Sequence, residues 1–212
     1  MRTYYNRIAG QSPERLAALS DGIFAVAMTL LVLDLHAPVI NIIQHPDIDA
    51  QLLTQLQHLL PNFLTYLMSF LTLGIFWVGQ QTQLNRFVRS DRDLTWIHLA
   101  YLLAVSLLPF STALLAADIT SHVAILVYWF DIFLLGVTLY ASIRYAWHAG
   151  LLKEEVDVEV RKTNERRIII AQTLYAFGAA LCFINTSWSI AFIFLVQLNY
   201  AIAPRIPFLR RL

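Results

Sequence analysis

The stretch RLAALSDGIFAVAMTLLVLDL, residues 15–35, predicts that this chain crosses a membrane. From Gly22 to Leu33 the only polar side chain is the hydroxyl of Thr29. A helix that spans a bilayer needs about 20 predominantly apolar residues, and this stretch supplies them. Hydrophobic residues occupy 58% of the 212 positions and charged residues only 14%, an apolar excess that a water-soluble domain could not bury. We therefore expect an all-α integral membrane protein.

Six windows of high hydropathy follow one another along the chain. No linker rich in Gly, Pro or Ser separates them and no convincing internal repeat relates them, so we expect one domain over residues 1–212. The last two windows are short, and Asn185, Thr186 and Ser187 between them are typical of a hairpin. The six expected transmembrane helices cover residues 16–35, 60–82, 95–115, 122–143, 167–184 and 188–203.

The cations are distributed unequally between the two sides of these spans. Lys and Arg near the ends of membrane spans are kept on the cytoplasmic side. All 15 lie in alternate connections, which predicts that both termini are cytoplasmic. The net charge of +1 hides this asymmetry and gives no reason to expect a nucleic-acid partner. The cations are Arg2, Arg7 and Arg15 before span one, Arg86, Arg89 and Arg92 after span two, those of residues 144–167 after span four, and Arg205, Arg210 and Arg211 at the end.

Asp21 is expected inside the first span. Ser12 and Pro13 are typical of a helix start, with Ser as the cap and Pro in the first turn. A helix that begins there carries Asp21 about 12 Å along its axis, too far for an end cap. A carboxylate at the centre of a span costs roughly 2.5–3.5 kcal/mol, and less near the interface. Asp21 should therefore face protein groups that compensate its charge.

The first span has two different faces. At 100° per residue, Gly22, Thr29, Leu30 and Leu33 all lie within about 60° of Val26. The Ser-Asp pair at positions 20 and 21 lies more than about 100° away from the same residue. One face is therefore apolar with a single hydroxyl, and the other is polar.

Polar side chains of the next two spans are expected at the level of this Ser-Asp pair. Span two runs inward and ends with FWVGQQTQLNRF, and span three starts inside with DLTWIHLAYLL. Indole, amide and imidazole groups can hydrogen-bond a buried carboxylate and hydroxyl. The alternative is that these are ordinary interfacial residues, with the Trp in an aromatic belt. The expected network comprises Ser20, Asp21, Trp77, Gln80, Gln81 and His98.

Three short motifs resemble those of a known family. R-x-x-x-x-S-D starts the first span as Arg15, Ser20 and Asp21, F-W occupies residues 76–77, and L-L-P-F-S-T occupies residues 107–112. In this combination the chain resembles the transmembrane protein 175 family of potassium channels, in particular its prokaryotic single-repeat members. The likeness covers the first half of the chain, and the second half agrees only in the number of spans.

The chain departs from the family pattern at four positions. Leu19 stands where Phe usually precedes S-D, Gln80 and Gln81 stand where a His pair is typical, and His98 stands where Asn is usual. We interpret these differences as polar groups exchanged within one network. A role that depends on the His pair is therefore not expected to carry over.

The resemblance implies a homotetramer in which four six-helix subunits surround an axial pore lined by span one. It implies that Val26, Leu30 and Leu33 form apolar constrictions, that Thr29 gives a hydroxyl ring with a preference for potassium over sodium, and that Arg15 joins the polar network. No segment resembles T-V-G-Y-G, so a hydrated ion would pass without a carbonyl filter, through a neck that gates by dewetting. The implied partners are lipid, potassium ions and identical subunits, without a cofactor or metal site. The implied location is a prokaryotic plasma membrane rather than an endolysosomal one.

Other interpretations stay open at this point. Apolar residues at helical spacing usually mark a core or a lipid-facing surface. Asp131, in the middle of span four, would fit a secondary transporter or proton-coupled carrier, because acids inside membranes often mark ion or proton relays. No inverted repeat favours a carrier, and Asp131 could instead make a structural contact with Gln172 or Asn185. An enzyme is not expected, because nucleophile elbow, H-E-x-x-H, Cys-cluster and P-loop motifs are all missing from the sequence.

Overall fold

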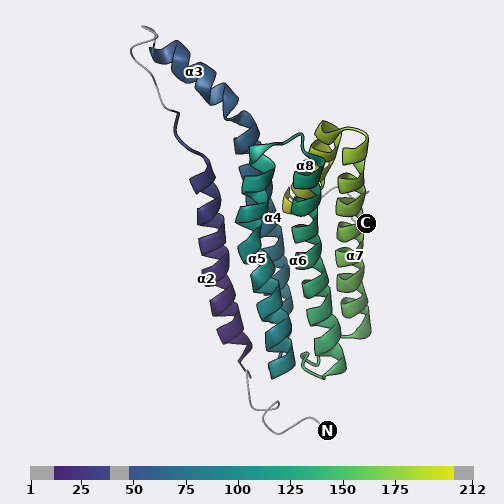
Figure 1. Cartoon of the computed structure of the whole chain (residues 1–212). Coiled ribbons are helices and arrows are strands. Elements are labelled where there is room, and N and C mark those ends of the chain that lie inside the picture. Colours follow the sequence, from purple (N-terminus) through teal and green to yellow (C-terminus); the bar gives the residue numbers. More distant parts are fainter. Residues whose placement is uncertain (1–11, 39–47, 203–212) are drawn as a thin grey trace.

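The computed structural model describes residues 12–38 and 48–202, and its main helices form an antiparallel bundle (Figure 1). Within these ranges the regular elements are all helices, apart from an isolated bridge between Phe87 and Leu152. The helices are α2 (Pro13–Leu31), α3 (Ile48–His58), α4 (Leu60–Leu84), α5 (Arg92–Ala117), α6 (His122–His148), α7 (Val158–Ala180) and α8 (Thr186–Ile202), with short 3₁₀ turns at η1 (Val32–Asp34) and η2 (Leu181–Phe183).

α2 begins where the sequence predicts. The Oγ atom of Ser12 accepts a hydrogen bond from the Arg15 backbone N–H at 3.3 Å, and Pro13 occupies the first turn. Pro suits this position because an N–H there would have no partner within the helix. The helix continues through Asp21 and tightens into η1 at its end.

In the part of the chain that the structure describes, four helices are long and apolar enough to cross a bilayer, namely α2 together with η1, α4, α5 and α6. α8 is apolar but has only 17 residues. α7 begins with the charged sequence VEVRKTNERR, and only its second half is apolar. The chain is therefore a multi-pass membrane protein, and the fifth and sixth expected spans correspond to a helix that is charged at one end and to a short helix.

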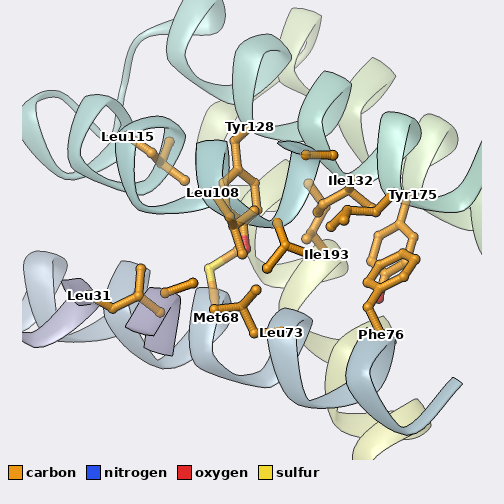
Figure 2. Packing of buried hydrophobic residues seen from close by; sticks show 14 of the residues in the cluster. Leu31, Met68, Leu73, Phe76, Leu108, Leu115, Tyr128, Ile132, Tyr175 and Ile193 are labelled. Carbon is orange, nitrogen blue, oxygen red and sulfur yellow. The ribbon is translucent and has the colours of Figure 1, made fainter. Parts of the chain in front are cut away.

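The hydrophobic core lies between α4, α5, α6 and α8. Figure 2 shows Met68 and Leu73 of α4 in one cluster with Leu108 of α5, Tyr128 of α6 and Ile193 of α8. These five side chains are almost completely buried. α2 packs against α4 and α5 from one side and lies at the edge of the bundle (Figure 1). This position leaves one side of α2 uncovered in the single chain.

α7 and α8 approach each other closely at Gly178. A Cβ atom at this position would lie 2.8 Å from Cγ1 of Ile193, so a larger residue would push the two helices apart. Ser189 also donates a hydrogen bond from Oγ to the Gly178 carbonyl oxygen at 2.7 Å. These contacts hold the hairpin that the sequence predicts at residues 185–187.

The described cations gather at one end of the bundle, around the loops 85–91 and 149–157. Gly150 makes the turn after α6 with a φ of 66°, a conformation that other residues rarely adopt. The chain then pairs with the first loop, because the Lys153 N–H donates to the Arg86 carbonyl oxygen at 2.9 Å. The remaining cations, which the sequence also assigns to this end, lie outside the described residues and are Arg2, Arg7, Arg205, Arg210 and Arg211.

Candidate functional site

α2 has a buried face that attaches it to the bundle. Leu16, Ser20, Phe24, Ala27 and Leu31 follow one another at intervals of three or four residues, and all five are buried. This spacing keeps side chains on one side of a helix with 3.6 residues per turn. α2 is therefore attached to α4 and α5 along a single stripe.

The opposite face of α2 is exposed and apolar. The exposed fractions of Val26, Leu30 and Leu33 are 57%, 44% and 64%, and Thr29 is exposed among them. These are the residues that the helical periodicity places together, and we call them the apolar strip. The strip is about 10 Å long at 1.5 Å per residue. In the single chain it is left for lipid, water or another subunit to cover.

The hydroxyl of Thr29 is oriented by its own helix. Its Oγ1 atom lies 3.0 Å from the carbonyl oxygen of Ala25 and 2.8 Å from that of Val26, and it donates toward them. A hydroxyl has one hydrogen to donate and two lone pairs that accept. Because the hydrogen is directed to the backbone, the lone pairs are available on the exposed side. They can accept a hydrogen bond from water or contact a cation.

Ser20, Gln80 and His98 join three helices inside the bundle, and all three are almost fully buried. Nε2 of Gln80 lies 2.7 Å from Oγ of Ser20 and 2.6 Å from Nε2 of His98. Oγ of Ser20 lies 2.9 Å from the same imidazole nitrogen and 2.7 Å from the Leu16 carbonyl oxygen. An amide nitrogen only donates, so His98 accepts at Nε2 and carries its hydrogen on Nδ1. This cluster holds α2, α4 and α5 together at one level.

Asp21 is compensated by two donors from α4. The Trp77 indole N–H donates to Oδ1 of Asp21 at 2.8 Å, and the Gln81 amide donates to the same oxygen at 2.6 Å. Hydrogen bonds to a charged acceptor are stronger than those between neutral groups. Unlike Ser20, however, Asp21 is exposed on the surface of the single chain. The structure thus places the hydroxyl of the Ser-Asp pair inside the bundle and the carboxylate at the seam between α2 and α4.

Arg15 lies apart from these polar groups. Its backbone N–H binds the Ser12 cap, and its exposed side chain has no hydrogen bond or ion pair with any residue in the described ranges. The other six expected residues form two hydrogen-bonded groups, one of Ser20, Gln80 and His98 and one of Asp21, Trp77 and Gln81. The participation of Arg15 stays a prediction.

A second polar cluster, which the sequence patterns did not reveal, lies in the core. The Tyr128 hydroxyl lies 3.2 Å from Oγ1 of Thr72 and 3.4 Å from Oγ of Ser69. Thr112 donates to Ser69 at 2.7 Å, and Gln197 donates to Thr72 at 2.8 Å. The five residues come from α4, α5, α6 and α8, and all are buried. The signal that could have found this cluster is the amide of Gln197, which directly follows the apolar run FIFLV at residues 192–196.

Asp131 has a partner that the sequence did not predict. Its Oδ2 atom accepts a hydrogen bond from Oγ of Ser111 at 3.0 Å, and its side chain is buried. Gln172 and Asn185 bind backbone groups instead. The suggested pairing of Asp131 with either of them is therefore wrong. The contact with Ser111 still joins two helices, α5 and α6, as a structural role for this carboxylate requires.

The apolar strip presents the hydroxyl oxygen of Thr29 and hydrocarbon side chains to its surroundings. Within residues 12–38 and 48–202, no three His, Cys, Asp or Glu side chains come together as a metal site would require. An arrangement of this kind can contact a hydrated cation weakly, but it does not provide a nucleophile or a general base.

This chain is similar to known channels over most of its length. Residues 15–109 match the family model described as endosomal/lysosomal potassium channel TMEM175. A potassium channel from Streptomyces collinus is 30% identical over 191 residues, which cover 88% of this chain and 90% of that protein. The chain belongs to the TMEM175 family. It is therefore a member of a family of cation channels, as its motifs predicted, and not of an enzyme family.

Other TMEM175 relatives agree in fold but differ in the ion that their names give. The crystal structure of a lysosomal potassium-selective channel TMEM175 homologue from Chamaesiphon minutus matches with a TM-score of 0.77 and 26% identity, covering 90% of this chain and 97% of that chain. The rat protein named endosomal/lysosomal proton channel TMEM175 is 24% identical over 200 residues, which are 94% of this chain but only 38% of that protein. The fold and the family are thus shared, whereas the names include both potassium and proton channels.

Proposed function

We propose that this chain forms a passive channel that prefers potassium to sodium, with α2 lining the pore. The observation that carries this proposal is the apolar strip, which no described helix covers. It lies on the side of α2 opposite the buried stripe that attaches this helix to the bundle. Different side chains therefore attach α2 and form its exposed face. The bacterial relatives named potassium channels support the choice of ion.

A pore of this kind requires several copies of the chain. α2 lies at the edge of the bundle, and one helix cannot enclose an axial path (Figure 1). In a homotetramer, four apolar strips would face one another across the axis. The exposed carboxylate of Asp21 also favours assembly, because a charge that faces lipid is costly. In this arrangement one domain contributes six spans, and both termini lie in the cytoplasm of a prokaryotic cell.

The apolar strip would form the neck of the pore. Val26, Leu30 and Leu33 would give successive rings separated by about 6 Å and 4.5 Å along the axis. Narrow apolar constrictions impede ions because water withdraws from them. The oxygen lone pairs of Thr29, one residue from Leu30, would replace part of the lost hydration. Sodium holds its water more tightly than potassium, so partial replacement favours potassium.

The polar groups on the attached side of α2 would have a structural role. The buried cluster of Ser20, Gln80 and His98 and the Asp21 contacts act at one level, and both engage side chains from α4. Together they fix the rotation of α2 about its axis. That rotation decides whether the apolar strip or the polar pair faces the neighbouring subunits. Arg15 would contribute to this structural role through its exposed side chain in the assembled tetramer.

A carrier based on Asp131 is the second candidate function. Oδ1 of Asp131 is buried and has no hydrogen-bond partner within the described residues, so this carboxyl has a free position for a proton. The group lies between α5 and α6, however, and not on the apolar strip. A carrier would require coupled transport of a second ion, which a channel does not.

Recordings from purified protein in planar bilayers test the proposal. With potassium on one side, sodium on the other and equal pH, discrete single-channel currents should reverse at a potential that shows a preference for potassium. A reversal potential that follows an imposed pH gradient would assign proton conduction instead. Ion flux that requires a second ion, without unitary currents, would assign a carrier. Native mass spectrometry should show a tetramer, and a monomer would exclude the axial pore.

A further inference from the structure

A cavity of about 560 Å³ lies between α4, α7 and the end of α8, apart from the apolar strip. Its lining includes Phe70, Gly74 and Val78 of α4 and Tyr175 of α7. The exposed fractions of Phe70 and Val78 are 41% and 56%, so the cavity opens on the outer surface of the bundle. We call it the α4–α7 cavity.

The α4–α7 cavity has the length of one bilayer leaflet. Its α4 wall runs from Phe70 to Gln83, which is about 20 Å at 1.5 Å per residue. One leaflet with its headgroup region is about 20 Å thick, half of a bilayer of roughly 40–45 Å. The lining near the middle of the bundle is apolar and includes Leu71 and Ile75. One acyl chain of a lipid matches this part in length and in polarity.

The other end of the cavity is polar and cationic. Arg167 lines it and has no ion-pair partner among the described residues, and Nδ2 of Asn164 is buried without an acceptor there. About 12 Å further along α7, Tyr175 is only 1% exposed, and its hydroxyl also has no hydrogen-bond partner within the described ranges. Helical side chains lean toward the N-terminus of their helix, which for α7 is the cation-rich end. Three donors without acceptors therefore line one cavity.

We propose that the α4–α7 cavity binds an anionic phospholipid from the leaflet at the cation-rich end of the bundle. The phosphate accepts hydrogen bonds from Arg167 and Asn164, and one acyl chain lies along α4 toward Tyr175. Charge complementarity selects this occupant. The C-terminal residues 203–212, APRIPFLRRL, carry three Arg and no acidic residue, so their composition does not supply the negative charge that complements Arg167.

The bound lipid would also influence the pore. Trp77 lines the α4–α7 cavity and donates its indole N–H to Asp21 on α2. A lipid in the cavity therefore restrains the same side chain that helps to fix the rotation of α2. This coupling rests on the proposed pore role of α2, whereas lipid binding itself does not.

Native mass spectrometry of the full-length protein with equal amounts of phosphatidylglycerol and phosphatidylcholine tests the binding. The wild-type chain should bind phosphatidylglycerol with a preference of about tenfold, as expected for a charge-assisted contact. Arg167→Gln should bring the two lipids close to equal binding. Arg166→Gln, which removes the adjacent exposed cation that does not line the cavity, should keep the preference.

A second variant tests the place of binding without disturbing the fold. Gly74 lines the cavity, and a Cβ atom there would meet no atom within 4 Å, so Gly74→Leu directs its side chain into this space. It should reduce binding of both lipids, whereas Gly74→Ala should leave it nearly unchanged. Lipid binding that is unaffected by Arg167→Gln and Gly74→Leu would overturn the proposal. Loss of the oligomer in Gly74→Leu, with lipid binding unchanged, would also overturn it and assign the cavity to a second copy of the chain.

Discussion

The two faces of α2 differ in their contacts, because one is packed against the bundle and the other is exposed. On the buried face, Ser20 has hydrogen bonds with α4 and α5 and is fully enclosed. On the other face, the apolar strip is exposed, and its one polar group, Thr29, is satisfied by its own helix. One helix can therefore serve both as part of a fixed scaffold and as a lining. Substitutions should separate these roles, with effects on stability from one face and on conduction from the other.

The largest effect is expected on the buried face, from His98→Ala. This change removes the acceptor for the Gln80 amide and leaves a void between the helices, so the free energy of unfolding should fall by about 3 kcal/mol. Thermal unfolding followed by tryptophan fluorescence would measure it. His98→Asn restores a polar group and should recover part of the loss. An unchanged unfolding midpoint in His98→Ala would show that this cluster does not hold α2.

The next largest effect is expected on the apolar strip, from Leu30→Asn. A polar ring keeps water in the neck, and lowering the barrier by about 1.4 kcal/mol raises conductance about tenfold while weakening ion discrimination. Val26→Asn should act in the same way. Single-channel recordings would measure both.

Ala27 and Ile23 provide the matched controls for the apolar strip. Ala27 is buried on the attached face and Ile23 packs partly against the core, so Asn at either position should reduce the yield of folded protein without opening the path. If Leu30→Asn left conductance and selectivity unchanged in a proven tetramer, α2 would not line the pore.

Asp21 tests the difference between the two faces of α2 further, because its side chain is exposed and yet hydrogen-bonded to α4. Asp21→Ala leaves the Trp77 and Gln81 donors without an acceptor, at a cost of about 1 kcal/mol, and should lower the yield of tetramer more than the conductance. Asp21→Asn keeps one acceptor oxygen and should be milder. Native mass spectrometry would quantify assembly. Normal tetramer yield with altered conductance would assign Asp21 to the conducting face.

The smallest effect is expected from Thr29→Val, which removes a hydroxyl at nearly constant volume. The permeability ratio of potassium to sodium should fall about threefold, which corresponds to roughly 0.7 kcal/mol, with little change in stability. Thr29→Ser keeps the oxygen and should preserve the ratio. Reversal potentials in a potassium–sodium gradient would measure it. A ratio unaffected by Thr29→Val would leave selectivity to the apolar rings alone.

Sequence periodicity was sufficient to predict the faces of α2, but it was insufficient to predict which residues contact the polar side chains in the core of the bundle. The start at Ser12 and the grouping of Val26 with Leu30 and Leu33 depend on local geometry, which the order of residues contains. The partner of Asp131 was predicted wrongly, because Ser111 lies on another helix and their contact depends on how α5 and α6 pack. The core cluster around Tyr128 was not predicted for the same reason.

The sequence alone determined the membrane class, the family and the two faces of α2, because hydropathy, motifs and helical periodicity are properties of neighbouring residues. Only the tertiary structure decided that Ser20 is enclosed while Asp21 is exposed, although they are consecutive. The physical reason is the placement of α4 and α5 around α2. A rotation of 100° between adjacent residues carries one side chain into the bundle and the next to its surface.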